Sequence, residues 1–261
     1  MKEISLKKTL KCNFNKERGS SCGGTQISTS NASVEKVVNM LNMTNNDVFV
    51  DLGSGGGKWV AAASRSTKQA VGYEVDKDTA SMSERNLKNA SLDHNTSIVN
   101  KDLLTLVEIP TKPTVVLTMN AGFPPLLQIK VMDLLLSLKP SLRLFCFVFG
   151  KINQESPLRD CFWAIKMHAK DVSVTCGKNQ HTLSIFDTTL PWFWSVLEAY
   201  MELAKQIPTK SWTIGSKAWD KLKRVKFTPL EKKRKREPRR WHKYIYLTPE
   251  QERELRKKKK K

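Results

Sequence analysis

The sequence predicts an α/β fold in which helices cover both faces of a mostly parallel, seven-strand sheet. Two observations predict this fold. Between residues 34 and 187, short runs rich in Val, Ile and Phe alternate with segments whose apolar residues recur at helical spacing. The first run, residues 48–52, carries an acid near its end and leads directly into a glycine-rich turn, as the first strand of a doubly wound fold does.

The predicted elements follow one another with short connections. Apolar residues at helical spacing predict a helix near 34–41, after which strand and helix patterns alternate. Strands are expected at 48–52, 70–75, 97–100, 114–119 and 142–149, and helices at 59–65, 78–90 and 126–138. Lys139 and Pro140 end the last of these helices, and the run 142–149 is apolar on both faces, which is typical of a central parallel strand.

The C-terminal part of the pattern closes the sheet. Residues 171–175 and 182–187 predict an antiparallel hairpin across 177–179, preceded by a helix at 161–168. The segment 191–205 predicts a further helix, because Pro191 suits a first helical turn and the apolar residues after it recur at spacings of three and four. We expect this apolar stripe to pack on the core.

Composition sets limits on the class of protein. A chain of 261 residues with 39% apolar residues can bury the core of one α/β domain and carry an appendage. No segment predicts a membrane span, because charged residues and a proline interrupt the most apolar region, 131–149, and residues 1–24 lack the apolar segment of a signal peptide. The five cysteines are scattered, which favours reduced thiols in an intracellular protein and no zinc site.

The net charge of +20 is concentrated at the two ends of the chain. Residues 205–261 hold 22 Lys or Arg against 6 Asp or Glu, and residues 1–18 hold 6 against 2, whereas residues 19–204 hold 17 of each sign. Like-charge blocks repel one another, so we expect a disordered, basic tail at 230–261. Such a tail predicts nucleic acid or chromatin as the partner, because neutralised phosphates release counterions. The alternative is a solubility or nuclear-import segment.

The turn after the first strand is the strongest functional signal. Asp51, Gly53, Ser54, Gly55 and Gly57 lie in the run D-L-G-S-G-G-G-K, and glycines let a backbone approach a ligand closely. The spacing completes neither the dinucleotide fingerprint nor the phosphate loop. A fixed carboxylate at the mouth of the turn repels polyphosphate and attracts cations. These residues predict a nucleotide-like cofactor without a polyphosphate; the alternative is a tight turn that binds nothing.

Two further strands also end in acids. Glu74 lies at the end of the second strand, about twenty residues beyond the glycines, where doubly wound folds place an acid on ribose hydroxyls. Asp102 follows the third strand, 97–100. Because the carboxyl ends of parallel strands share one edge of a sheet, the three acids are expected to lie along the same binding site.

These features resemble class I S-adenosylmethionine-dependent methyltransferases, which have a Rossmann-like sheet of seven strands with the antiparallel pair last. The resemblance covers the glycine run that follows Asp51 and the acids Glu74 and Asp102. It implies S-adenosyl-L-methionine as the cofactor, whose sulfonium and amino groups suit the acidic mouth. It also implies that Asp102 lies beside the adenine amino group.

The chain also resembles the disruptor-of-telomeric-silencing family of non-SET histone lysine methyltransferases over about residues 24–189. Residues 43–55, M-T-N-N-D-V-F-V-D-L-G-S-G, are similar to that family's first motif, and Asn120 and Phe123 match its asparagine and aromatic residue after the fourth strand. The resemblance implies that Thr25 and Asn120 bind the cofactor. It also implies catalytic roles, in which the Asn120 amide orients the amine or the cofactor and the Phe123 ring lines the lysine channel. The alternatives are a turn asparagine and a core aromatic residue.

The resemblance predicts a protein-lysine N-methyltransferase that acts in the nucleus on a histone or another chromatin-associated protein, with nucleosomes bound through the basic tail. The expected organisation is a basic leader (1–24), the methyltransferase domain (25–189), a helical extension (190–229) and the tail (230–261). No metal site is predicted.

Two other functions remain open. Gly24 stands where the family has an acid, and the family's two tyrosines have no counterpart near 181–182, which favours a chromatin- or nucleic-acid-binding protein with weak or lost catalysis. The other function is nucleic-acid methylation, although here the prolines follow Phe123, the wrong order for the amino-methylating motif.

Overall fold

The structure is a computed structural model that describes residues 29–120, 123, 125–148 and 169–205. The chain divides into two units, Met1–Ser216 and Lys217–Lys261, and the second lies wholly outside the described residues. The predicted helix at 161–168, the leader with Thr25 and the tail at 230–261 also lie outside them. The expected division into four segments therefore stays a prediction.

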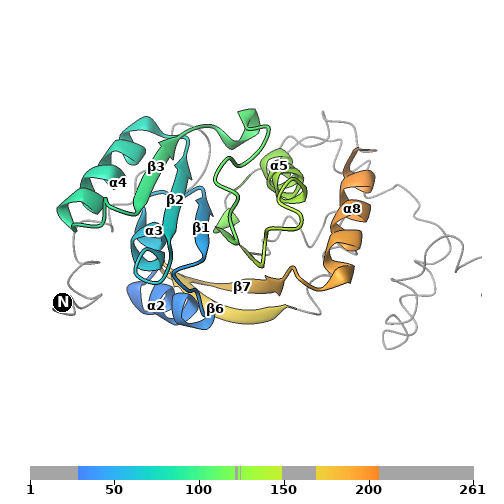
Figure 1. The fold of residues 1–261 in the computed structure, drawn as a ribbon, viewed down its shortest axis with the longest axis horizontal. Helices are drawn as coiled ribbons and strands as arrows, with labels where there is room; N and C mark the ends of the chain where they lie inside the picture. Colours follow the sequence, from blue (N-terminus) through green and yellow to red (C-terminus); the bar gives the residue numbers. More distant parts are fainter. Residues whose placement is uncertain (1–28, 121–122, 124, 149–168, 206–261) are drawn as a thin grey trace, which may run out of the picture. The chain divides into compact units, whose positions relative to one another are not determined.

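In the described part of the chain, seven strands and five helices follow the predicted order, and a short 3₁₀ helix is added to them (Figure 1). The strands are β1 (Val48–Leu52), β2 (Gln69–Glu74), β3 (Thr96–Asn100), β4 (Val115–Thr118), β5 (Leu144–Val148), β6 (Lys170–Cys176) and β7 (Asn179–Asp187). The helices are α2 (Asn31–Met40), α3 (Lys58–Ala63), α4 (Lys77–Asn89), α5 (Pro125–Leu136), α8 (Pro191–Lys205) and the short 3₁₀ helix η1 (Leu103–Thr105).

The strands form one sheet in the order β3-β2-β1-β4-β5-β7-β6. The first five strands are parallel, whereas β7 is antiparallel to both β5 and β6. The strand order reverses between β1 and β4, where Val50 pairs with Val71 on one side and Val116 on the other. Ligands of doubly wound sheets bind at the carboxyl ends of strands at such a switch point. The predicted fold class and the antiparallel last pair are confirmed.

Predicted boundaries are wrong mainly where turns decide them. The hairpin has a tighter turn than expected, because Cys176 pairs with Asn179 and leaves only Gly177 and Lys178 between the strands. β7 therefore starts at Asn179, three positions before the predicted 182. Gly177 has φ +57°, which favours glycine and permits this short connection. The 3₁₀ turn η1 was not predicted, since three residues carry no periodicity.

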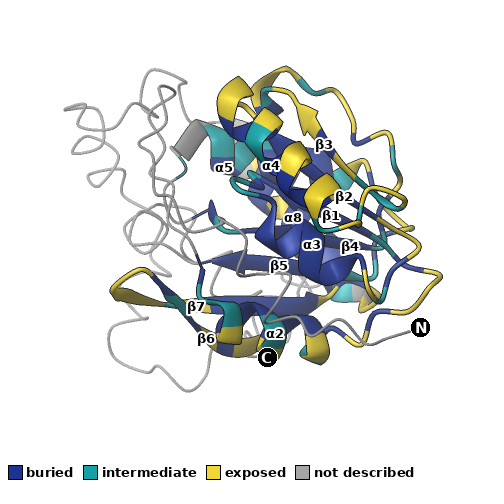
Figure 2. Ribbon diagram, turned by 90° about the vertical axis from the view of Figure 1, so that its left-hand side faces the viewer, coloured by how far each residue is buried: buried dark blue, intermediate teal, exposed yellow. Residues whose placement is uncertain are grey.

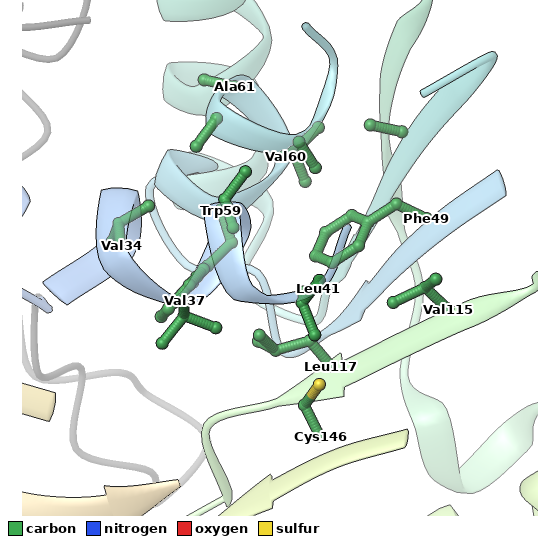
Figure 3. Packing of buried hydrophobic residues seen from close by; sticks show 14 of the residues in the cluster. Val34, Val37, Leu41, Phe49, Trp59, Val60, Ala61, Val115, Leu117 and Cys146 are labelled. Carbon is green, nitrogen blue, oxygen red and sulfur yellow. The ribbon is translucent and has the colours of Figure 1, made fainter. Parts of the chain in front are cut away.

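Helices α2, α3 and α4 pack on one face of the sheet (Figure 1). Phe49 of β1, Leu117 of β4 and Cys146 of β5 meet Trp59 and Val60 of α3 in this layer (Figure 3). All six residues of α3 are buried, as the dark ribbon of this short helix shows in Figure 2. The helix that follows the glycine turn is thus held between the sheet and its neighbours, which fixes the position of the turn itself.

Helices α5 and α8 pack against each other and lie on the other side of the sheet from α2, α3 and α4 (Figure 1). The aromatic rings of Phe145, Phe186 and Phe193 continue from β5 through β7 to α8, with centroid separations of 5.9 and 6.2 Å. Tyr200 and Met201 of α8 are also buried. The apolar stripe predicted at 191–205 therefore packs into the core, and this prediction is confirmed.

Asp47 ties together the starts of three strands at the edge opposite their carboxyl ends. Its carboxylate accepts hydrogen bonds from the Thr44 backbone N–H (2.8 Å), from the Thr114 hydroxyl (2.7 Å) and from Arg143 (3.1 and 3.3 Å). Burial by itself would raise the pKa of Asp47, but these hydrogen bonds and the Arg143 charge outweigh burial and hold the pKa below its usual value.

We expect Asp47→Asn to lower the free energy of unfolding at neutral pH by about 1–3 kcal/mol, because it weakens several hydrogen bonds to a charged group. The folded-state pKa of Asp47 is lowered, so its stabilisation is present above the unfolded pKa of about 4 and is lost as the pH falls through the folded value. Urea unfolding of both proteins at neutral and strongly acidic pH measures the difference. A difference that stayed constant on acidification would contradict this account.

Candidate active site

The glycine turn after β1 is folded back onto β2 by its own backbone. The N–H groups of Gly53 and Ser54 both donate to the Tyr73 carbonyl at 2.9 Å. Gly53, Gly55 and Gly57 have φ values of +87°, +49° and +77°, where a side chain is strained. Gly57 also caps α3, so the turn passes directly into that buried helix.

Gly55 faces open space, whereas other glycines of this region are tightly covered. A Cβ atom placed at Gly55 meets no atom of the described residues within 4 Å. A Cβ atom at Gly72 of β2 would lie 2.6 Å from the Ser54 side chain, so that position needs glycine to admit Ser54. The sequence analysis did not single out Gly72. The turn thus presents bare backbone outward at Gly55, where a ligand can approach closely.

Asp51 places a buried carboxyl group beside this turn. Its side chain is 1% exposed, and no residue in the described part of the chain donates a hydrogen bond to either oxygen. Burial raises the pKa of Asp51 well above its usual value, and the neighbouring Glu74 charge raises it further. The Ser54 hydroxyl is likewise buried without a described partner. A buried carboxyl without a partner is costly, and a cationic ligand group would relieve that cost.

Glu74 supports the glycine turn from the end of β2. Its carboxylate accepts from the Gly55 N–H at 2.8 Å and from the Asp76 N–H at 3.0 Å. The first bond holds the turn, and the second holds the residue that caps α4. Each carboxylate oxygen has a further lone pair, so Glu74 can still accept from ligand hydroxyls, as the sequence predicts.

Asp102 lies at the end of β3 and starts the short helix η1. One of its carboxylate oxygens accepts from the Leu104 N–H at 2.9 Å. Exposed apolar side chains stand next to both strand-end acids, namely Val75 after Glu74 and Leu104 in η1, which are 40% and 43% exposed. Neither residue was among the predicted site residues, although both stand close to the acids in the sequence. Apolar surface beside hydrogen-bonding acids can bind an aromatic ring such as adenine.

Asn120 follows β4 and is fully buried. Its Oδ1 accepts from the Val148 N–H of β5 at 2.9 Å, which fixes the orientation of the amide. Its Nδ2 therefore points the other way, and no acceptor for it lies among the described residues. Asn120 thus has a structural half, which binds β5, and an unpaired donor half.

Phe123 joins this strand end to the glycine turn. Its ring lies so close to Gly53 that a Cβ atom placed there would be 2.6 Å from Cζ. Its N–H donates to the Asn120 carbonyl at 2.9 Å, which links Phe123 to the end of β4. The structure therefore brings Asp51, Asn120 and Phe123 to the same edge of the sheet, as the sequence predicts. Thr25 lies outside the described residues.

Lys58, the lysine after the glycines, does not lie over the turn as a phosphate-binding lysine would. Its side chain is buried, and its Nζ donates to the Thr29 carbonyl at 2.6 Å. Burial lowers the pKa of Lys58, and the nearby Cys176 partly offsets that effect. The described residues contain no group of three or more side chains that could hold a metal ion. Among them, no helix is long and apolar enough to span a bilayer.

The fold and the site define a class I methyltransferase. Similar solved structures include an RNA methyltransferase from Salinibacter ruber in complex with S-adenosyl-L-homocysteine (19% identity, 62% of this chain, 93% of that chain, TM-score 0.44). A dimethyladenosine transferase from Plasmodium falciparum is 14% identical, with 62% of this chain and 63% of that chain covered and a TM-score of 0.49. An S-adenosylmethionine-dependent O-methyltransferase from Thermotoga maritima is 14% identical, with 70% of this chain and 71% of that chain covered and a TM-score of 0.47. A search of curated protein sequences gives no significant match.

The profile of the family described as "Histone methylation protein DOT1" matches residues 26–156, just over half of the chain. The chain belongs to this family, and the resemblance noted in the sequence is confirmed. Its cofactor is S-adenosylmethionine.

The residues present fit that cofactor. Asp51 offers to a cationic group a buried carboxyl that has no hydrogen-bond partner among the described residues, and Gly55 offers bare backbone next to open space. We expect Asp51 and Ser54 to hold the methionine end of the cofactor, Glu74 the ribose and Asp102 the adenine, with Gly53 and Gly57 shaping the turn.

Proposed function

We propose that this protein is an S-adenosylmethionine-dependent protein-lysine N-methyltransferase that acts on a histone or another chromatin-associated protein in the nucleus. Membership in the histone methylation family carries the proposal. Asn120 and Phe123 support it, because they match the family's asparagine and aromatic residue after the fourth strand. The Phe123 ring lies on the glycine turn, and the Phe123 N–H donates to the Asn120 carbonyl.

The reaction asks the protein mainly to position groups and exclude water. The bound cofactor supplies a methyl group on a sulfonium, and a lysine side chain must attack it as an uncharged amine. The Phe123 ring on Gly53 gives an apolar wall that favours the uncharged amine over the ammonium form. Asn120 offers a donor, so it suits an oxygen of the cofactor or of the target backbone; the amine lone pair must stay free for attack.

The target class is tested by incubating the full chain with labelled cofactor and, separately, nucleosomes, free core histones, RNA and DNA. Mass spectrometry then locates the label. Label on histone lysines in either protein sample supports the proposal. Label on RNA or DNA alone would show a nucleic-acid methyltransferase. Binding of nucleosomes and cofactor without any label would show a binding protein that has lost turnover.

The basic ends of the chain support the choice of a nucleic-acid-bound target. Residues 230–261 hold 15 Lys or Arg against 5 Asp or Glu, whereas residues 19–204 carry no net charge. A polycation of this kind binds phosphate through counterion release, without reading sequence. We propose that residues 230–261 bind nucleosomal DNA while the sheet domain binds the cofactor and the target lysine.

Deleting residues 230–261 is expected to weaken nucleosome binding strongly and to leave cofactor binding unchanged. The deletion removes a net charge of ten, and the affinity of the full chain should fall by about 0.9 log units per phosphate contact for each log unit of salt. Fluorescence anisotropy with nucleosomes at several salt concentrations gives the salt dependence of affinity for the full chain and for the deletion variant. Calorimetry with the cofactor is the control. Equal nucleosome affinity of the two proteins at low and moderate salt would leave the tail without this role.

A further inference from the structure

Gln128 is a buried polar residue in a helix whose other uncharged residues are all apolar. It lies on α5, Pro125–Leu136, whose sequence P-L-L-Q-I-K-V-M-D-L-L-L is dominated by Leu, Ile, Val and Met. Its side chain is 2% exposed, and Nε2 donates to the Phe123 carbonyl at 2.8 Å. Its Oε1 has no donor among the described residues. A buried amide costs stability unless its hydrogen bonds are used, so a glutamine here needs an explanation beyond packing.

The hydrogen bond of Gln128 belongs to a continuous chain that ends in the active site. Gln128 Nε2 donates to the Phe123 carbonyl, and the Phe123 N–H donates to the Asn120 carbonyl at 2.9 Å. Asn120 Oδ1 in turn accepts from the Val148 N–H at 2.9 Å. These hydrogen bonds connect α5, Phe123, Asn120 and the end of β5. The two site residues among them are Phe123, whose ring lies on Gly53, and Asn120, whose Nδ2 has no acceptor in the described part of the chain.

We propose that Gln128 is the positioning residue for the methyl-acceptor side of the site. It places the Phe123 ring against the glycine turn and, through the hydrogen bond from the Phe123 N–H to the Asn120 carbonyl, orients Asn120. Gln128 acts through these two residues and not on the reacting atoms. The cofactor side is held independently, because Tyr73 and Glu74 bind the glycine turn from β2. The proposal rests on methyl transfer at this site.

Gln128→Met tests the proposal because methionine has a similar length and volume but no donor. We expect the turnover number on the protein that the enzyme methylates to fall about tenfold or more. The cofactor dissociation constant should change less than about twofold, since the hydrogen bonds of Tyr73 and Glu74 to the glycine turn remain. The matched control is Asp133→Ala on the same helix, which removes an exposed ion pair with Lys130 (3.2 Å) and should leave both quantities unchanged.

A second variant separates positioning from mere packing. In Gln128→Glu the ionised carboxylate cannot donate to the Phe123 carbonyl, but the protonated carboxyl can. We therefore expect its activity relative to wild type to rise as the pH is lowered, whereas the ratio for Gln128→Met should stay flat. A Gln128→Glu ratio that stayed flat at the low level of Gln128→Met would overturn the proposal.

Hydrogen exchange gives a readout that does not depend on the target. In Gln128→Met, peptides that contain Phe123 and Val148 should exchange their amide protons several-fold faster, while peptides of β1 and β2 keep their wild-type rates. Unchanged exchange in the Phe123 peptide of a folded variant would overturn the positioning role. Faster exchange without any lysine product in wild type would instead leave the positioning role intact and contradict the proposed target.

Discussion

Replacing Asn120 with alanine is expected to slow methyl transfer by about a hundredfold or more while weakening cofactor binding by less than about tenfold. The change removes the Asn120 Nδ2 donor, which has no acceptor among the described residues, and a single preorganised donor typically contributes about a hundredfold to a rate. Single-turnover rates with saturating labelled cofactor measure the step, and calorimetry measures the cofactor affinity.

The same residue also serves the fold, so a control is required. Asn120→Ala leaves the buried Val148 N–H without its acceptor, which by itself costs about 1–3 kcal/mol of stability. The melting temperature of Asn120→Ala is therefore measured alongside its rate, at a temperature where the variant is folded. A folded alanine variant with wild-type turnover would show that the Asn120 donor takes no part in the reaction.

Replacing Asp51 with asparagine is expected to weaken cofactor binding by about tenfold to a hundredfold and to make the cofactor-free protein more stable at neutral pH. A hydrogen bond between charged partners contributes about 1.5–3 kcal/mol, and the variant loses that charge. Asp51 is buried with no described partner, so removing its carboxyl relieves the cost of burying a charge.

The pH dependence of Asp51 has a definite sign. Its folded-state pKa is raised, so relative to the unfolded chain its contribution to stability is greatest below the unfolded pKa and is lost as the pH rises through the folded value. The stability gained by Asp51→Asn should therefore grow with pH. A cationic ligand group lowers this pKa again, so cofactor binding should release protons.

Thermal unfolding from acidic to neutral pH, together with calorimetry in buffers of different ionisation enthalpy, checks both statements. Gly55→Arg is the comparison for binding, because it fills the open space beside the turn and should abolish binding without removing the Asp51 proton equilibrium. An asparagine variant that is less stable than wild type at neutral pH would contradict the burial argument.

The strands were predictable because each is a short run with a single apolar pattern. β1 matches its predicted limits, and the limits of α8 are also as predicted, since Pro191 fixes its first turn. The start of β7 was missed because Asn179 and Gln180 carry no strand signal; their pairing depends on the tight turn at Gly177. The local apolar pattern therefore predicts which strands and helices form, whereas the start of β7 depends on its pairing with β6.

The site was predictable only where motif and strand end coincide. Asp51 and Glu74 could be placed because acids at the ends of parallel strands share one edge. The divided role of Asn120 could not be predicted, since the orientation of its amide depends on Val148, a residue distant in sequence. Gln128 left one weak signal, the only amide in a helix rich in Leu, Ile, Val and Met, but its hydrogen bond to the Phe123 carbonyl could not be predicted from that signal.

The bond between Lys58 and Thr29 also determines where the smallest usable fragment of this protein can begin. The helical pattern suggests that the folded part starts with α2 at Asn31, yet the Lys58 ammonium donates to a carbonyl two residues earlier. The Ser30 N–H also pairs with the Thr175 carbonyl at the edge of the sheet. A fragment cut at the helix would keep every predicted element but lose an acceptor for a buried charge. Expression and crystallisation should therefore start from Thr29 or earlier.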